Sequence, residues 1–230
     1  MRAIRFFGCV VGVFTAFAVA AAESPAANTE AARIEQAIGA YAAKLRADQE
    51  KARDTAVANR ATALLEDPVT PVLGNRNGDV AIVMFFDYAC AFCKAAEPRL
   101  LQLLKDDKGV KLIFKEFPIL TPESRIAAKA SLAASRQGKY ESFHLALMAF
   151  RGKLEAPTIF EIAKNVGLDV ERLRRDMDAP EIADQIIANF NLARPLGITS
   201  TPTFIIGTHL VTEPSAQIDF PKAVAAARAR

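Results

Sequence analysis

The stretch Val80–Lys94, VAIVMFFDYACAFCK, decides the fold of this 230-residue chain. It begins with an uninterrupted apolar run from Val80 to Phe86, which is typical of a strand buried on both faces of a sheet. Cys90 and Cys93 follow where this run gives way to residues that favour a helix. A CxxC pair at a strand-to-helix turn is the arrangement of a thiol–disulfide redox centre. We therefore predict a redox site at the start of a helix.

The sequence on the C-terminal side of this stretch predicts a split α/β domain. A helix runs to about residue 105, and residues 110–117 alternate enough to form a second strand. A wholly helical segment comes next, with glycines that mark helix ends. Its expected helices cover residues 124–137, 141–150, 158–166, 169–177 and 180–196. A strand at 203–206, a short partner strand around 210–211 and a helix at 218–230 complete the domain.

A second marker is Thr201-Pro202, directly before the strand at 203–206. A CxxC after a buried strand, with Thr-Pro-Thr-Phe at this distance, resembles the DsbA type of thioredoxin-fold protein over about residues 64–230. The resemblance implies an α/β thioredoxin fold with a helical domain inserted at about 121–196. It also implies thiol–disulfide oxidoreductase activity, with a cis bond before Pro202 that places the proline against the redox cysteines.

The start of the chain predicts export. Residues 1–22 combine a short basic beginning, an uncharged apolar run and a small-residue end, which together are typical of a Sec-type signal peptide. The apolar run is short for a membrane-spanning helix, which needs about 20 residues. We therefore expect a periplasmic protein. Loss of Arg2 and Arg5 would take the formal net charge from +3 to near neutral, which gives no electrostatic reason to expect nucleic acid as a partner.

The cysteines indicate reactivity rather than structural cross-linking. Cys9 lies in the predicted signal peptide, and Cys90 and Cys93 close a loop too short to restrict the unfolded chain much. Unpaired N–H groups at a helix N-terminus stabilise a thiolate, so the pKa of Cys90 should lie below that of a free thiol. We assign Cys90 as the accessible, attacking sulfur and Cys93 as the less accessible, resolving sulfur.

Further residues complete the predicted site. By resemblance, Thr201 and Pro202 join the catalytic residues, and Phe92 and Thr201 are assigned to substrate binding. Proline holds the preceding Thr201 in an extended conformation, in which its backbone can pair with a substrate strand. Ala91 and Phe92 lack the histidine of the most oxidising relatives, which argues for a less extreme oxidant. Threonine before the proline resembles isomerase-type members more than the strongest oxidase.

One position departs from the family pattern. The family often has a buried acid six residues before the first cysteine, thought to handle the proton of the resolving cysteine. Met84 occupies that position here, which leaves proton transfer without its usual residue. Asp87 is the nearest acid, but the favoured interpretation is that it caps a turn or binds backbone.

We predict no cofactor and no metal site. Two sulfurs fill only half of a tetrahedral zinc shell. The two histidines, His144 and His209, are expected at the surface, on an insertion helix and on a hairpin. Copper(I) binding by the two thiolates remains an alternative, because soft sulfur suits that ion.

The segment 23–63 is predicted to form a helical stalk and linker ahead of the domain at 64–230. A helix over about 31–46 is expected, followed by a charged helical or flexible stretch at 47–62. The first helix carries an apolar seam of Ile34, Ile38, Tyr41 and Leu45 at alternating steps of four and three residues. Such a helix cannot bury its stripe alone, so it packs either on the domain or on copies of itself. The segment resembles the ScsC-like branch, whose N-terminal segment mediates trimerisation and whose members shuffle disulfides.

The predicted function is thiol–disulfide exchange on exported proteins, leaning to disulfide isomerase in a homo-oligomer, with a trimer expected by resemblance. A membrane redox partner is expected to reset Cys90 and Cys93. The alternative within the enzymes is a monomeric DsbA-type dithiol oxidase. The alternative from another class is a copper-binding or surface interaction protein.

Overall fold

The computed structural model describes residues 25–229, so the predicted signal peptide lies outside the described residues. The chain divides into two compact units, Met1–Arg46 and Ala47–Arg230. Among the described residues, no helix combines the length and the apolar character needed to cross a membrane. Each unit is described here by itself.

Helix α1 (Pro25–Ala58) makes up the described part of the first unit and continues into the second. It begins earlier than the predicted residue 31, and the stretch from Ala47 to Ala58 is helical rather than flexible. Strong helix formers such as Ala, Glu, Lys and Arg dominate both halves, which explains the continuity. The seam residues are exposed: Ile34 by 51%, Ile38 by 63%, Tyr41 by 65% and Leu45 by 42%.

The second unit is built on a five-stranded sheet in the order β1-β3-β2-β4-β5, as far as the described residues show. The strands are β1 (Val72–Gly74), β2 (Val80–Phe86), β3 (Val110–Glu116), β4 (Thr203–Ile206) and β5 (His209–Leu210). β2 pairs with β3 in parallel, and the other pairings are antiparallel. Helix α3 (Ala91–Asp106) connects β2 to β3. The mixed α/β fold is therefore that of the thioredoxin class, as predicted.

Both faces of β2 are buried, which explains its uninterrupted apolar sequence. Ile82, Met84 and Phe86 belong to the core beneath α3 and helix α9 (Phe220–Arg228). Ala81, Val83 and Phe85 belong to a second core on the opposite face, which also contains Val57 and Leu64. The strand that precedes the cysteines is thus held from both sides.

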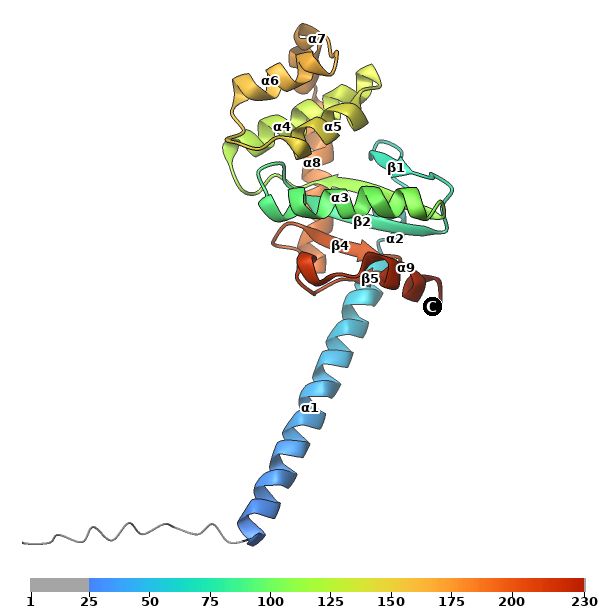
Figure 1. Cartoon of the computed structure of the whole chain (residues 1–230), viewed down its shortest axis with the longest axis vertical. Helices are drawn as coiled ribbons and strands as arrows, with labels where there is room; N and C mark the ends of the chain where they lie inside the picture. The colour runs from blue at the N-terminus through green and yellow to red at the C-terminus, as the bar shows by residue number, and fades with distance from the viewer. Residues whose placement is uncertain (1–24, 230) are drawn as a thin grey trace, which may run out of the picture. The chain divides into compact units, whose positions relative to one another are not determined.

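The predicted helical insertion is present between β3 and β4. It consists of α4 (Pro122–Ala134), α5 (Tyr140–Ala149), α6 (Ala156–Asn165), α7 (Val170–Met177) and α8 (Pro180–Ala193), followed by a 3₁₀ turn to Leu196. In Figure 1, α4 to α7 gather at one end of the unit, and α8 leads from them back towards the sheet. Asn189 on α8 anchors this return, because its side-chain amide donates a 3.0 Å hydrogen bond to the carbonyl of Glu116 on β3.

Two features of the second unit differ from the sequence interpretation. The compact unit begins at Ala47, earlier than the predicted boundary at 63–64, and takes in helix α2 (Ala61–Leu65). The reason is that Val57 and Leu64 are buried in the core below β2. Strand β1 forms in a segment for which the sequence analysis named no strand, and its pairing with β3 supplies its hydrogen bonds.

Candidate active site

The two cysteines lie where β2 ends and α3 begins. Cys90 is the N-cap of α3, and the backbone N–H of Cys93 donates a 3.2 Å hydrogen bond to the Cys90 sulfur. Both cysteines are free thiols. The exposed fraction is only 4% for Cys90 and 0% for Cys93, so Cys90 is less accessible than we expected from its position. The exposed residue of the motif is Phe92, at 67%.

Thr201 lies against Cys90, and Pro202 directly follows it in the chain. The Cys90 thiol donates a hydrogen bond to the carbonyl of Thr201 at 3.3 Å, across more than a hundred residues of sequence. The Thr201–Pro202 peptide bond is cis. Phe92, Thr201 and Pro202 line an open groove of about 820 Å³. Thr201 and Pro202 therefore share one surface with Phe92, whereas Cys90 and Cys93 are buried beside it.

The two sulfurs have opposite electrostatic environments. The pKa of Cys90 is lowered to about 6, first by hydrogen bonding with the Cys93 side chain and then by Thr201 and by backbone N–H groups. The pKa of Cys93 is raised well above that of a free thiol, first by burial and then by its interaction with Cys90. Near neutral pH, Cys90 is therefore the thiolate and Cys93 the protonated thiol. This asymmetry is what a nucleophile and a resolving cysteine need.

The side chain of Asp87 binds the surrounding turn, and no hydrogen bond joins it to either cysteine among the described residues. One carboxylate oxygen accepts hydrogen bonds from the backbone N–H of Ala89 and the hydroxyl of Ser124, both at 2.7 Å. The other accepts from the backbone N–H groups of Ile119 and Leu120, both at 2.9 Å. The interpretation that Asp87 binds backbone is confirmed.

A buried polar cluster lies in the core beyond the cysteines, and most of it was missed in the sequence. Its members are Tyr88, Glu97, Glu116, Tyr140 and His144, which are at most 7% exposed. His144 Nδ1 lies 2.9 Å from the Tyr88 hydroxyl, and its Nε2 lies 3.2 Å from Glu97 Oε1. Tyr88 and Tyr140 each donate a 3.1 Å hydrogen bond to Glu116 Oε1.

The placement of His144 corrects the sequence interpretation. We expected a surface residue on an insertion helix, but His144 is fully buried and stacks on the ring of Tyr140. Met84 is also fully buried, in the same core as Cys93. Position 84 therefore has no acid, but two buried acids, Glu97 and Glu116, lie elsewhere in that core. One of them, Glu97, was detectable, because it stands four residues after Cys93 and so on the same helix face.

The geometry is matched by the comparisons with known proteins. The Thioredoxin family profile matches residues 66–226. A thioredoxin-like oxidoreductase from Silicibacter pomeroyi is 44% identical, with a TM-score of 0.70, over 74% of this chain and 98% of that one. The thiol–disulfide exchange protein alpha-DsbA2 from Wolbachia pipientis is 31% identical, with a TM-score of 0.70, over 78% of this chain and 97% of that one.

A third structure shares the fold over more of the chain. It is a linker-deletion mutant of Proteus mirabilis ScsC, with 22% identity and a TM-score of 0.72, covering 91% of this chain and 99% of that one. Among curated proteins, a Na⁺/H⁺ antiporter from Salinispora tropica is 30% identical over 145 residues. The chain spans only 22% of the length of that antiporter.

A CxxC at the start of α3, a Thr-Pro pair against it and these matches define a thioredoxin-fold redox protein. The chain belongs to the thioredoxin family and is similar to thiol–disulfide oxidoreductases of the DsbA type.

Proposed function

We propose that this oxidoreductase acts on exported proteins in the periplasm and reshuffles their disulfides as a homo-oligomer. The single observation that carries the finer assignment is the exposed apolar seam on α1, defined above by Ile34, Ile38, Tyr41 and Leu45. Export follows from the signal-peptide pattern of residues 1–22.

The chemistry proceeds by thiolate exchange. The Cys90 thiolate attacks one sulfur of a client disulfide, forms a mixed disulfide and releases the other client sulfur as a thiolate. In isomerisation, a client thiolate then attacks the client sulfur of the mixed disulfide and Cys90 leaves as a thiolate, so no net electrons are transferred. In the alternative outcome, Cys93 loses its proton and attacks Cys90, which reduces the client by two electrons and leaves a Cys90–Cys93 disulfide.

The environment of Cys93 supports the first outcome. Burial is the main cause of its raised pKa, and this cause does not depend on a negative charge at Cys90. A protonated thiol is a poor nucleophile, so the mixed disulfide has time to rearrange. The low pKa of Cys90 makes it a good leaving group for the same step. A membrane redox partner would then keep the pair in its dithiol form.

The seam supports an assembly. Burying an Ile or Leu side chain stabilises a protein by about 1.5–3 kcal/mol, so leaving the whole seam in water is unfavourable. Steps of four and three residues are those of a helix that pairs with copies of itself. The resemblance to the ScsC-like branch favours a trimer. Several CxxC sites would then act on one client, which helps to correct a wrong disulfide.

The test compares variants of the seam in the mature protein, residues 23–230. Ile38→Asp combined with Tyr41→Asp places charges in the seam, whereas Gln36→Asp introduces one on another face of the same exposed helix. We expect light scattering to show an oligomer for the wild type and Gln36→Asp, and a monomer for the double variant. Refolding of scrambled ribonuclease should fall in the double variant, while reduction of insulin should continue.

The monomeric oxidase is the competing function. A wild type that is monomeric at micromolar concentration would favour it, as would equal isomerase rates in the seam variant and the wild type. Loss of both activities in Cys90→Ser, with trapped mixed disulfides in Cys93→Ser, is expected under either assignment. That result tests the shared chemistry separately from the assembly.

A further inference from the structure

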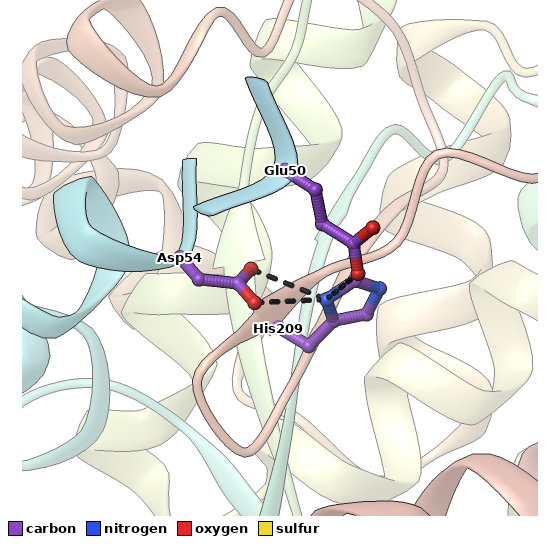
Figure 2. Close-up of side chains that lie close together, drawn as sticks. All are labelled: Glu50, Asp54 and His209. Carbon is purple, nitrogen blue, oxygen red and sulfur yellow. Dashed lines mark hydrogen bonds and ion pairs between the residues drawn. The ribbon is translucent and has the colours of Figure 1, made fainter. Parts of the chain in front are cut away.

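A second group of ligand-type side chains lies in the second unit, away from the cysteines. Glu50 and Asp54 stand one turn apart near the end of α1, and His209 begins β5 on the hairpin that follows β4. Figure 2 shows both carboxylates directed at the same imidazole nitrogen. His209 Nδ1 lies 3.2 Å from each oxygen of Asp54 and 3.7 Å from Glu50 Oε1.

The spacing of these atoms fits a metal ion. A zinc ion with bonds of about 2.0–2.2 Å holds neighbouring tetrahedral ligand atoms about 3.3–3.6 Å apart. The nitrogen–oxygen distances of 3.2 and 3.7 Å bracket that range, and one ligand atom from each residue lies within 4.8 Å of the others. Imidazole with carboxylates is a ligand set that divalent transition metals accept. Three protein ligands leave one coordination position for water.

The surroundings provide two independent supports. Like charges at positions i and i+4 of a helix repel, so Glu50 and Asp54 together favour a cation between them and His209. Glu50, Asp54 and Thr208 also line a shallow surface depression, which gives solvent access for entry of an ion and for a water ligand. Asp54 is oriented from the hairpin side, because the backbone N–H of Leu210 donates a 3.3 Å hydrogen bond to its Oδ1.

Glu50, Asp54 and His209 lie next to the groove that contains Phe92 and Thr201. Gln49, Ala52 and Arg53, on the neighbouring face of the same helical segment, line the groove that contains Phe92 and Thr201. A cation held by Glu50, Asp54 and His209 would fasten that segment to the β4–β5 hairpin. We propose that Glu50, Asp54 and His209 form a binding site for a divalent transition-metal ion, which clamps the end of α1 and so fixes one wall of the substrate groove.

The test measures zinc binding by calorimetry on the mature protein, prepared without a histidine tag and treated with chelator. The protein is used in its Cys90–Cys93 disulfide form, so that thiolates cannot take up the metal. We expect one Zn²⁺ per chain, with affinity reduced at least tenfold in Asp54→Asn and in His209→Gln. Asp48→Asn is the matched control, since it removes one carboxylate from an exposed position of the same helix and should leave the affinity unchanged.

Hydrogen exchange provides the second readout. Zinc should slow exchange of the backbone N–H groups of residues 47–58 in the wild type and in Asp48→Asn, but not in His209→Gln. Circular dichroism of each variant establishes that it is folded. Absence of zinc binding by the wild type would refute the site and leave a histidine–carboxylate ion pair. So would an affinity in Asp54→Asn and His209→Gln equal to that of the wild type. Binding without slower exchange would refute the clamp.

Discussion

Two regions of the molecule reverse the usual distribution of side chains, and they do so in opposite ways. The seam on α1 leaves large apolar groups in water, whereas the polar cluster of Tyr88, Glu97, Glu116, Tyr140 and His144 is enclosed in the core. Each member of the cluster has a hydrogen-bond partner within it, although Oε2 of Glu97 and Oε2 of Glu116 have none among the described residues. In the described part of the chain, the apolar side chains of the seam remain exposed to water. The difference teaches that buried polar groups with partners inside the fold are part of its structure, whereas an exposed apolar face with no cover is the basis for proposing a partner.

The largest expected effect comes from breaking the polar cluster. His144→Leu would leave Glu97 Oε1 without its imidazole partner, whereas the Tyr88 hydroxyl would keep its hydrogen bond to Glu116. A buried polar group left unsatisfied costs about 1–3 kcal/mol, so the free energy of unfolding should fall by about 2–3 kcal/mol. Urea unfolding followed by circular dichroism measures it. A loss below about 1 kcal/mol would show that the cluster is not an interdependent network.

The next effect separates the polar cluster from the redox chemistry. Thr201 lowers the pKa of Cys90, so Thr201→Val should raise it above about 6. No residue of the polar cluster is among the causes of the Cys90 shift, so Glu97→Gln should leave that pKa unchanged. The rate of alkylation of the reduced protein against pH gives both values. A shift of the Cys90 pKa in Glu97→Gln as large as that in Thr201→Val would show that the polar cluster also controls the redox site.

A third prediction uses pH. Burial raises the pKa of Glu116 well above 4.5. The unfolded chain therefore releases this proton at lower pH than the folded protein does, and Glu116 makes stability fall as pH rises above about 4.5, by at most about 1.4 kcal/mol per pH unit. Glu116→Gln should flatten the decline between its unfolded and folded pKa values. Urea unfolding from pH 5 to 8 provides the comparison, and identical slopes would count against a protonated Glu116.

A smaller effect is expected for Tyr140→Phe. It removes one of the two hydroxyl donors to Glu116 and keeps the ring that stacks on His144. The loss should be about 1 kcal/mol, since the Tyr88 hydrogen bond remains. Urea unfolding of Tyr140→Phe and His144→Leu, measured under the same conditions, shows whether the loss in free energy of unfolding grows with the number of hydrogen bonds removed.

The smallest effect on chain stability is expected in the seam. Ile38→Asp changes a side chain that is 63% exposed, so unfolding of the second unit should shift by no more than about 0.5 kcal/mol. Denaturation measured at protein concentrations where the variant and the wild type are both dissociated tests this. A larger loss would mean that Ile38 supports the fold of the chain itself.

The sequence predicted the central part of the fold well because the information there is local. The apolar run of β2, the CxxC at the start of α3 and Thr201-Pro202 each occupy a few consecutive residues, and the helical insertion follows from periodicity. The structure was needed for everything that depends on contacts between distant segments. The burial of His144, the strand β1 and the attachment of residues 47–58 to the second unit are of this kind. Lys115 is another, since it is fully buried where Thr70 and the carbonyl of Ala63 accept its hydrogen bonds.

The two edges of the described sheet have a consequence for the proposed action on other protein chains. The edge strands are its shortest, with three residues in β1 and two in β5. An exposed edge offers unpaired N–H and C=O groups to any extended segment it meets, and short edges offer few of them. Under the proposed function, short edges would limit coaggregation of the protein with unfolded clients. Backbone contacts with a client would form instead in the groove lined by Thr201, which contacts Cys90.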